Sequence, residues 1–212
     1  TFLGPVNLAT MARQTVVVAI TSLGMTFVIL LGGIDLAVGS VVALTSVVVA
    51  LRLGAGSSVL AAASLGVLTA ASTGAVTGAL ITRARLSPFI VTLGGMSVLR
   101  GLAKGLAGEQ KVDADPRGLD TLMTASASTS LPAGVYLAGA LALLAALVLE
   151  YTVFGRHVRA IGSNAHTARL CGIRVERVTV IVYTLAGALT GVAGVLEFAT
   201  LTVGDPTDSI GL

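Results

Sequence analysis

Residues 32–40 read GGIDLAVGS and interrupt an apolar stretch that runs from residue 15 to residue 51. The interruption places an aspartate among glycines, in a region apolar enough to lie within a bilayer. A carboxylate at that depth costs about 2.5–3.5 kcal/mol on membrane-insertion scales, so such residues usually have a function. Glycines let the backbone break or pack closely, and a broken apolar helix is typical of a transport path. We predict that the gate or path lining consists of Gly32, Gly33, Asp35, Gly39 and Ser40.

Asp35 also has a simpler interpretation. It stands just before the apolar residues 36–51, where a side-chain oxygen caps a helix and the helix dipole favours a negative charge. On the sequence alone both roles stay open, a lining residue of a path and a cap of the following segment.

The composition predicts an all-α fold, a polytopic transmembrane helix bundle. Hydrophobic residues make up 55% of the 212-residue chain and charged residues only 11%. A soluble domain carries about 25% charged residues. The mean hydropathy of +0.97 points the same way. A large soluble enzyme with buried helices is the alternative, and compositional base rates disfavour it.

The apolar pattern predicts about six membrane segments, with a break near Gly32–Asp35 between the first two. The second segment is short enough to be a tilted or partial span. Pro88 and Pro132 open the fourth and fifth segments, as proline does in a first helical turn. The predicted segments are residues 11–31, 36–51, 59–82, 88–103, 132–154 and 178–200.

Charge sets the expected orientation. Residues 155–177 contain five arginines and one acid, so the positive-inside rule places this loop in the cytoplasm. Alternation then puts residues 83–85 inside and the polar loop 104–130 outside. The break in GGIDLAVGS falls on the cytoplasmic half or within the membrane. Arg13 and Arg52 fall outside, against the rule. Nucleic acid is excluded as a partner, because basic and aromatic residues do not interleave to stack bases.

The arginine-rich loop 155–177 is predicted to contain a short surface helix. Ser163 or Asn164 is a suitable N-cap, and residues 165–171 form about two turns. Gly172 stands where a left-handed C-cap belongs.

One side of this short helix is predicted to be a face of small residues that fits a groove on a partner protein. The face consists of Ala165, Ala168 and Cys171, with Arg169 on the flank. An interfacial helix held by anionic lipid headgroups is an equal alternative on physical grounds.

Glycines four residues apart indicate close helix packing within a compact bundle, because small faces let helix backbones approach in lipid. The pairs are Gly74/Gly78, Gly101/Gly105 and Gly187/Gly191.

Motifs of enzymes and metal sites are missing from the chain. It has no GxxxxGK[ST] phosphate loop, no GxSxG nucleophile elbow and no HExxH zinc helix. Cys171 is the single cysteine, so neither an intrachain disulfide nor a cysteine-based metal site is supported. His157 and His166 are expected to be solvated loop residues. We therefore expect no enzyme activity, no metal and no cofactor of the chain's own.

Several stretches together resemble one known family. They are GGIDLAVGS, SPFIVTLGGMSVLRG (residues 87–101), FGRHVRAIGSNAHTARLCG (residues 154–172) and YTLAGALTGVAG (residues 183–194). In this order and spacing they resemble the monosaccharide permeases of ABC importers, of the ribose/xylose/arabinose type. The resemblance covers nearly the entire chain.

The resemblance implies a half-pore in the bacterial plasma (inner) membrane, formed by a multi-pass sugar transport subunit. It implies three partners: a second permease subunit in a homo- or heterodimer, a cytoplasmic ATPase subunit that binds the ATP, and an extracytoplasmic sugar-binding protein. The ATPase-coupling helix would comprise residues 164–172, which favours docking over lipid binding. The coupling residues implied are Asn164, Ala165, Ala168, Arg169 and Gly172.

Two departures from the family are expected to matter. Family members are longer, so residues 1–212 are expected to be one permease domain that is incomplete at both ends. The family often carries alanine or acidic residues where His166 and Thr167 stand, so charge matching to the ATPase is expected to differ.

Other functions stay open on the residues. A secondary transporter driven by an ion gradient also suits a broken helix that carries an acid. A non-transporting membrane assembly subunit is a further alternative. Among ABC importers, permeases for branched-chain amino acids are relatives, and GGIDLAVGS resembles the sugar permeases more closely.

Overall fold

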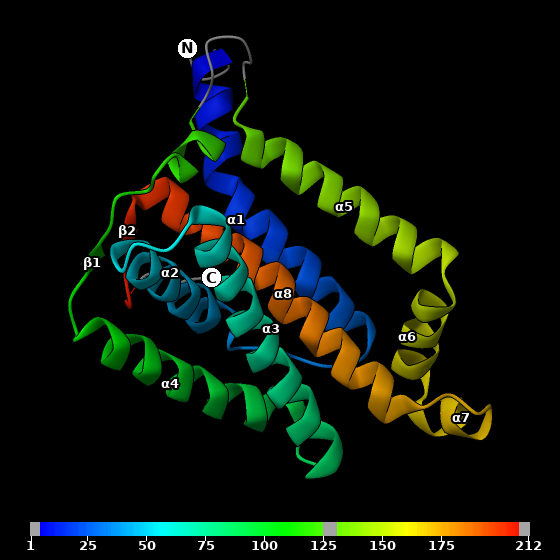
Figure 1. Ribbon diagram of the computed structural model, residues 1–212. Coiled ribbons are helices and arrows are strands. Elements are labelled where there is room, and N and C mark those ends of the chain that lie inside the picture. The colour runs from blue at the N-terminus through cyan, green and yellow to red at the C-terminus, as the bar shows by residue number, and fades with distance from the viewer. Residues whose placement is uncertain (1–4, 125–130, 208–212) are drawn as a thin grey trace.

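The computed structural model describes residues 5–124 and 131–207, with side chains from residue 7 onward. These residues form a helical bundle with one two-stranded antiparallel sheet (Figure 1). The elements are α1 (Pro5–Leu30), α2 (Val38–Gly54), α3 (Val59–Arg83), α4 (Pro88–Ala107), β1 (Val112–Asp113), the 3-10 helix η1 (Leu119–Leu122), α5 (Ala133–Tyr151), α6 (Val153–Ser163), α7 (Ala165–Leu170), α8 (Val175–Leu201) and β2 (Val203–Gly204).

The predicted all-α fold with several membrane segments is confirmed in the described part of the chain. Five helices, α1, α3, α4, α5 and α8, are long and apolar enough to cross a membrane. The second predicted segment corresponds to α2, an apolar helix of 17 residues that is shorter than these spans. α1, α4 and α8 extend a few residues beyond their predicted bounds.

α8 lies at the centre of the bundle, with α1, α2 and α3 around it (Figure 1). It is the most buried of the five long helices, whereas α4 and α5 are the least buried. α4 packs mainly on α2, and α5 packs on α1 and α6. The two outer helices therefore present long apolar faces away from the core.

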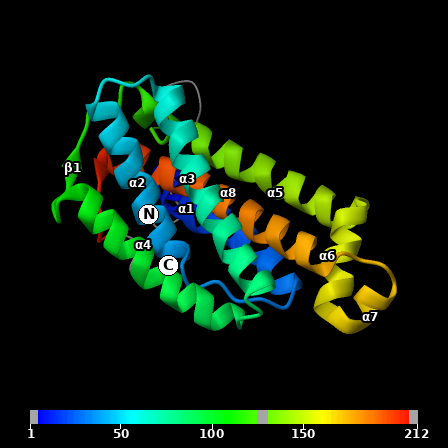
Figure 2. The same ribbon diagram turned by 60° about the horizontal axis from the view of Figure 1, so that its bottom comes forward.

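The chain direction alternates as charge predicted. The turn from α3 to α4 lies at the same end of the bundle as α6 and α7 (Figure 2). A cavity there is lined by side chains of α3, the following turn, α7 and α8. The β1–β2 sheet and η1 lie at the opposite end (Figure 1). We call these the arginine end and the sheet end.

α3 and α8 meet backbone to backbone because glycines stand where they touch. A Cβ atom at Gly74 would overlap the carbonyl of Tyr183, and one at Gly187 would overlap the carbonyl of Ala70. Cβ atoms built at Gly78 and Gly191 would also meet neighbours across this interface, each at 2.8 Å. Such close approach is how helices associate in lipid, where burial of apolar area gives no driving force.

The third predicted glycine pair behaves differently. Nothing lies within 4 Å of a Cβ atom built at Gly101 or at Gly105 on α4. The expectation of close packing is therefore wrong for this pair within the chain, because these glycines lie on the exposed side of an outer helix.

α1 ends in a Schellman motif, which the glycines make possible. The N–H of Gly33 donates to the carbonyl of Val28 and the N–H of Gly32 to that of Ile29, both at 2.9 Å. Gly32 takes a φ of +86°, a left-handed conformation that glycine adopts without steric cost. The chain then runs without helical structure to the start of α2, and we call residues 31–37 the linker.

The sheet end is closed by an ion pair as well as by the strands. Lys111 Nζ lies 2.9 Å from Asp205 Oδ2, next to the pairing of Val112 with Gly204. Burial would raise the pKa of Asp205, but hydrogen bonds from Thr207 and Lys111 outweigh it and lower the pKa to about 2. The carboxylate therefore stays charged at any physiological pH.

The predicted fifth segment, residues 132–154, is wrong at its C-terminal end. α5 ends at Tyr151, because Thr152 takes an extended conformation and accepts a hydrogen bond from the N–H of Gly155 at 3.1 Å. Thr152 is thereby the N-cap of α6, and Phe154 belongs to that helix. The hydropathy pattern does not indicate the change of direction at Thr152, because apolar residues continue on both sides of it.

The arginine-rich loop contains two helices rather than the single one predicted. α6 is amphipathic: Val158 and Ile161 are buried one turn apart, whereas Arg156 and Arg159 are exposed. Two of the five arginines that indicate a cytoplasmic loop therefore lie on the outer face of a helix at the end of the bundle.

We expect Gly187→Leu to destabilise the detergent-solubilised protein, because the new side chain must displace the backbone of α3. Overpacking of this kind typically costs about 1–3 kcal/mol. Gly101→Leu is the matched control, since its Cβ atom has no neighbour within 4 Å. Thermal unfolding, followed as loss of the monodisperse peak in gel filtration, measures both. Equal losses in the two variants would contradict the assigned α3–α8 interface.

Candidate functional site

The residues predicted to line a path come together at the linker and the first turn of α2. Gly32, Gly33 and Asp35 lie in the linker, and Gly39 and Ser40 lie in the first turn of α2. Figure 2 shows the linker passing from the end of α1, near α6, to the start of α2, near α4. The stretch therefore joins two regions of the bundle at the arginine end.

The linker has one face toward the protein and one face away from it. Gly33 and Ala37 are buried, whereas Ile34 and Leu36 are 48% and 38% exposed. Such alternation is typical of an extended chain, in which successive residues point to opposite sides. The linker thus behaves as a single strand laid against the bundle.

Asp35 forms an Asx turn before α2 and does not cap the helix itself. Its Oδ1 accepts a hydrogen bond from the N–H of Ala37 at 2.8 Å, and Ala37 is the residue that precedes α2. The N-cap position has no side-chain cap, so the predicted capping role is wrong in this form. A role of Asp35 in a gate stays a prediction.

Gly39 and Ser40 are buried, so they lie inside the protein in this conformation. Ser40 is fully buried, and its Oγ has no hydrogen-bond partner in the described part of the chain. Their part in a path also stays a prediction.

A tyrosine that the sequence reasoning did not single out contacts the linker. Tyr183 of α8 is 1% exposed, and its hydroxyl donates to the carbonyl of Ile34 at 3.3 Å. The hydroxyl oxygen of Thr92 in α4 lies 3.4 Å from the same carbonyl oxygen. The non-helical carbonyl of Ile34 thus accepts a hydrogen bond from a side chain of α8, and a hydroxyl of α4 lies close to it.

α7 is capped at both ends as predicted. Asn164 accepts a hydrogen bond from the N–H of Thr167 at 3.0 Å. Gly172 has a φ of +82° and donates to the carbonyl of Arg169 at 2.9 Å, in a second Schellman motif. Six residues would not hold a helix in isolation, so these caps and the packing below define it.

The small-residue face of α7 was predicted to point toward a partner protein, and this prediction is wrong. Ala168 is 4% exposed and shares a buried cluster with Ile161 of α6 and Val175 of α8. Ala165 packs against the same cluster, and Cys171 is exposed. The small face therefore anchors α7 to its own chain instead of facing a partner.

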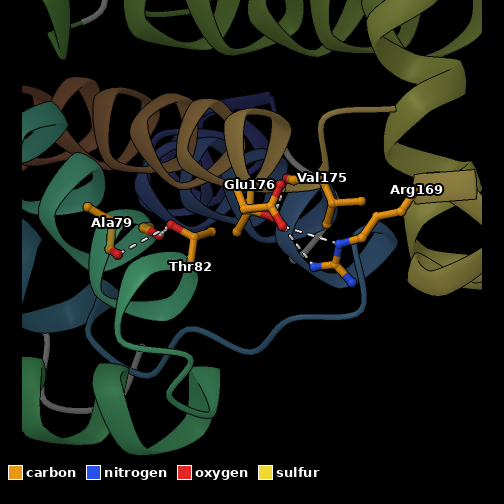
Figure 3. Close-up of polar contacts among 7 residues, drawn as sticks. Ala79, Thr82, Arg169, Val175 and Glu176 are labelled. Carbon is orange, nitrogen blue, oxygen red and sulfur yellow. Dashed lines mark hydrogen bonds and ion pairs between the residues drawn. The ribbon is translucent and has the colours of Figure 1, made fainter. Parts of the chain in front are cut away.

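The outward face of α7 combines a large apolar side chain with polar residues. Leu170 is 76% exposed, and His166, Thr167 and Arg169 are exposed beside it. Arg169 reaches α8 and donates to Glu176 Oε1 through Nη2 at 3.0 Å and through Nε at 3.2 Å (Figure 3). This exposed pair bridges α7 and α8 and contributes little stability, on the order of 0–1 kcal/mol.

Two hollows lie near these elements. A cavity of about 470 Å³ at the arginine end lies between α3, α7 and α8, and Thr82, Arg85 and Glu176 are among its lining residues. A groove of about 700 Å³ separates α3 from α4. Its α3 side carries Thr69 and Ser72, whose hydroxyls donate to their own helix and leave lone pairs to accept hydrogen bonds.

Arg100 is a further residue that the sequence reasoning missed. It lies inside α4, and its buried Nε has no hydrogen-bond partner in the described part of the chain. The available signal was a lone basic residue within an apolar segment, which is costly in a membrane. Tyr183 gave no comparable signal, because a tyrosine within an apolar helix is ordinary.

No group of three or more potential metal ligands from His, Cys, Asp and Glu occurs within residues 5–124 and 131–207. His157 is half-buried on α6, and His166 is exposed on α7.

Comparison with known proteins gives one family and several relatives. Residues 7–212 match the family described as branched-chain amino acid transport system / permease component. The ribose import permease protein RbsC of Escherichia coli K12 is 36% identical over 208 residues, which cover 97% of this chain and 65% of the relative. No solved structure matches the chain.

Two more relatives have similar coverage. RbsC of Bacillus subtilis is 40% identical over 215 residues, covering 97% of this chain and 64% of the relative. The L-arabinose ABC transporter permease protein AraH of Azospirillum brasilense is 35% identical over 212 residues, covering 100% and 62%. The chain thus spans somewhat less than two thirds of the length of these curated relatives.

We expect Asp35→Asn to retain the stability of the parent protein, because an asparagine oxygen still accepts the hydrogen bond from Ala37. Asp35→Ala removes the acceptor and should cost about 1 kcal/mol, as loss of one hydrogen bond does. Thermal unfolding in detergent compares the two variants. If asparagine destabilised the protein as much as alanine, the carboxylate charge rather than the hydrogen bond would be what this position requires.

Proposed function

Because the chain belongs to the family described as branched-chain amino acid transport system / permease component, we propose that it is the permease subunit of an ATP-driven ABC importer. The proposed cargo is a monosaccharide, a pentose or hexose. The relatives at 35–40% identity are a ribose import permease and an L-arabinose permease, which supports a sugar over an amino acid. Five long apolar helices in a bacterial permease family place the chain in the plasma (inner) membrane as a multi-pass protein.

In this proposal the chain forms the translocation path, and a partner subunit binds the ATP. The sequence has no phosphate loop, so a separate ATPase subunit would bind and hydrolyse the nucleotide. A ligand-driven change of state needs a difference in binding between the two states. Here ATP binding to the partner would supply that difference, and the permease would respond through the surface that the two subunits share.

The observation that carries the proposal is the geometry of α7. This short helix lies at the arginine end, is capped by Asn164 and Gly172, and is held on its inner side by Ala168. Its outer face offers the exposed Leu170, which suits a groove on a partner better than open water. We therefore assign α7 as the ATPase-coupling helix, with Leu170 in place of the small-residue face as its apolar anchor.

The remaining proposed partners occupy other surfaces. The exposed apolar faces of α4 and α5 are available to a second permease subunit and to lipid. The sheet end, opposite to α7, is the side on which an extracytoplasmic sugar-binding protein would dock.

The coupling role is tested by Gly172→Val, with uptake of radiolabelled D-ribose and L-arabinose measured in cells that carry the complete transporter. A β-branched residue in the left-handed conformation costs about 1–2 kcal/mol, so the Schellman motif of α7 should open. We expect uptake and co-purification of the ATPase to fall while membrane insertion persists.

Gly56→Val is the matched control for that variant. Gly56 has a φ of +88°, close to the +82° of Gly172, and both have no neighbour within 4 Å of a Cβ atom. Gly56 lies in the α2–α3 turn at the sheet end, away from α7, so co-purification of the ATPase should persist. Normal uptake in Gly172→Val would count against the coupling role. Uptake that survived ATP depletion and collapsed with the proton gradient would instead indicate a secondary transporter.

A further inference from the structure

Tyr183 has a position that the proposed docking of α7 does not explain. It is a large, buried side chain in the middle of the bundle, and its hydroxyl contacts the backbone of the linker rather than another side chain. The accepting group is the carbonyl of Ile34, which lies between Gly33 and Asp35 of the predicted path. Tyr183 thus connects α8 directly to the residues predicted to line the path.

The tyrosine is the main donor to that carbonyl. Thr92 lies at 3.4 Å from the Ile34 oxygen but at 2.9 Å from the carbonyl of Pro88, on its own helix. A hydroxyl has one hydrogen to donate, so the shorter bond to Pro88 takes it. The Tyr183 bond at 3.3 Å has no such competitor among the hydrogen bonds of the described residues.

Steric fit also ties the tyrosine to the linker. A Cβ atom at Gly33 would lie 2.6 Å from the Tyr183 hydroxyl oxygen, a distance that real contacts do not reach. The linker backbone therefore lies directly against the tyrosine hydroxyl. The hydroxyl occupies the space that a side chain at Gly33 would need.

The N-terminal end of α8 is joined to α7 by a short connection. Four residues separate the two helices, and the Arg169–Glu176 pair spans the same corner. Ala168, Val175 and Tyr183 belong to one buried cluster. Tyr183 lies eight residues beyond Val175, about 12 Å along the helix at 1.5 Å per residue.

α6, on the other side of α7, touches the linker as well. A Cβ atom at Gly162 would overlap the carbonyl of Leu30, and Gly162 is the closest neighbour of Gly32. Both helices that hold α7 therefore contact the linker, α6 at its beginning and α8 at Ile34.

We infer that Tyr183 is a positioning residue that fastens the linker to α8, so that displacement of α7 reaches the predicted path residues. The inference rests on the proposed function, in which a partner ATPase moves α7. The linker follows α8 because its backbone is hydrogen-bonded to the tyrosine at Ile34 and is in close steric contact with it at Gly33.

The test is Tyr183→Phe, which removes the hydroxyl and keeps the ring that fills the core. The matched control is Tyr136→Phe on α5, where the tyrosine is 57% exposed. Both variants are assayed in proteoliposomes with the ATPase and D-ribose-loaded binding protein. We expect D-ribose imported per ATP hydrolysed to fall about fivefold in Tyr183→Phe, the factor expected for loss of one hydrogen bond, and to stay unchanged in the control.

A second readout follows the linker itself rather than transport. The chain's single cysteine, Cys171, is changed to serine, and Leu36, which is 38% exposed, is changed to cysteine. Labelling with N-ethylmaleimide is timed without nucleotide and after trapping with ATP and vanadate. The rate should differ between the two states with Tyr183 present, and Tyr183→Phe should remove that difference while ATPase co-purification stays intact.

The contact between the tyrosine and the glycine gives a suppressor test. Gly33→Ala should lower transport, because its methyl group collides with the hydroxyl. In the Tyr183→Phe background the collision disappears, so adding Gly33→Ala should lower transport by a smaller factor than it does alone. Equal factors in both backgrounds would overturn the assigned contact.

Failure of the inference and failure of the proposed function give different results. If the parent complex imports D-ribose with ATP and Tyr183→Phe keeps both the parent transport ratio and the nucleotide-dependent labelling, the inference is overturned and the function stands. If the parent complex neither binds an ATPase nor responds to ATP, the proposed function fails, and the inference fails with it.

Discussion

A backbone carbonyl or N–H group at membrane depth has to find its partner within the protein, because lipid offers none. The linker between α1 and α2 is not helical, so its backbone groups need partners outside a helix. Three different groups provide them. The Gly33 N–H returns to α1 in a Schellman motif, Asp35 satisfies the N–H of Ala37, and Tyr183 satisfies the carbonyl of Ile34. The glycines, the acid and the tyrosine thus act as one solution to a single problem.

The proposed coupling connects α7 to the linker after α1, and the same backbone motif ends both helices. α1 and α7 both end in Schellman motifs with a left-handed glycine, Gly32 and Gly172. Between them, side chains from α1, α6, α7 and α8 share a buried cluster, so the surface helix and the linker are connected through packed atoms. A close-packed interior transmits displacement, since it has few voids to absorb it.

The sequence predicted the parts of this fold that depend on local patterns. Hydropathy located the membrane segments, arginines located the end that carries α7, and Asn164 and Gly172 located its caps. The corner at Thr152 was missed because apolar residues continue across it, and hydropathy does not register a change of direction. The inward face of Ala168 and the reach of Tyr183 to Ile34 depend on contacts far apart in the chain, which spacing along one helix cannot reveal.

The glycine contact between α3 and α8 has a mechanical consequence. Where two helices meet through their backbones, as at Gly74 and Gly187, no side-chain rotamers are available to accommodate sliding. Shear between packed helices depends on such small side-chain adjustments. The two helices should therefore move together as one unit, and bending should fall outside their contact. The turn of residues 84–87, where Arg85 has a φ of +53°, lies at the end of α3 beyond that contact.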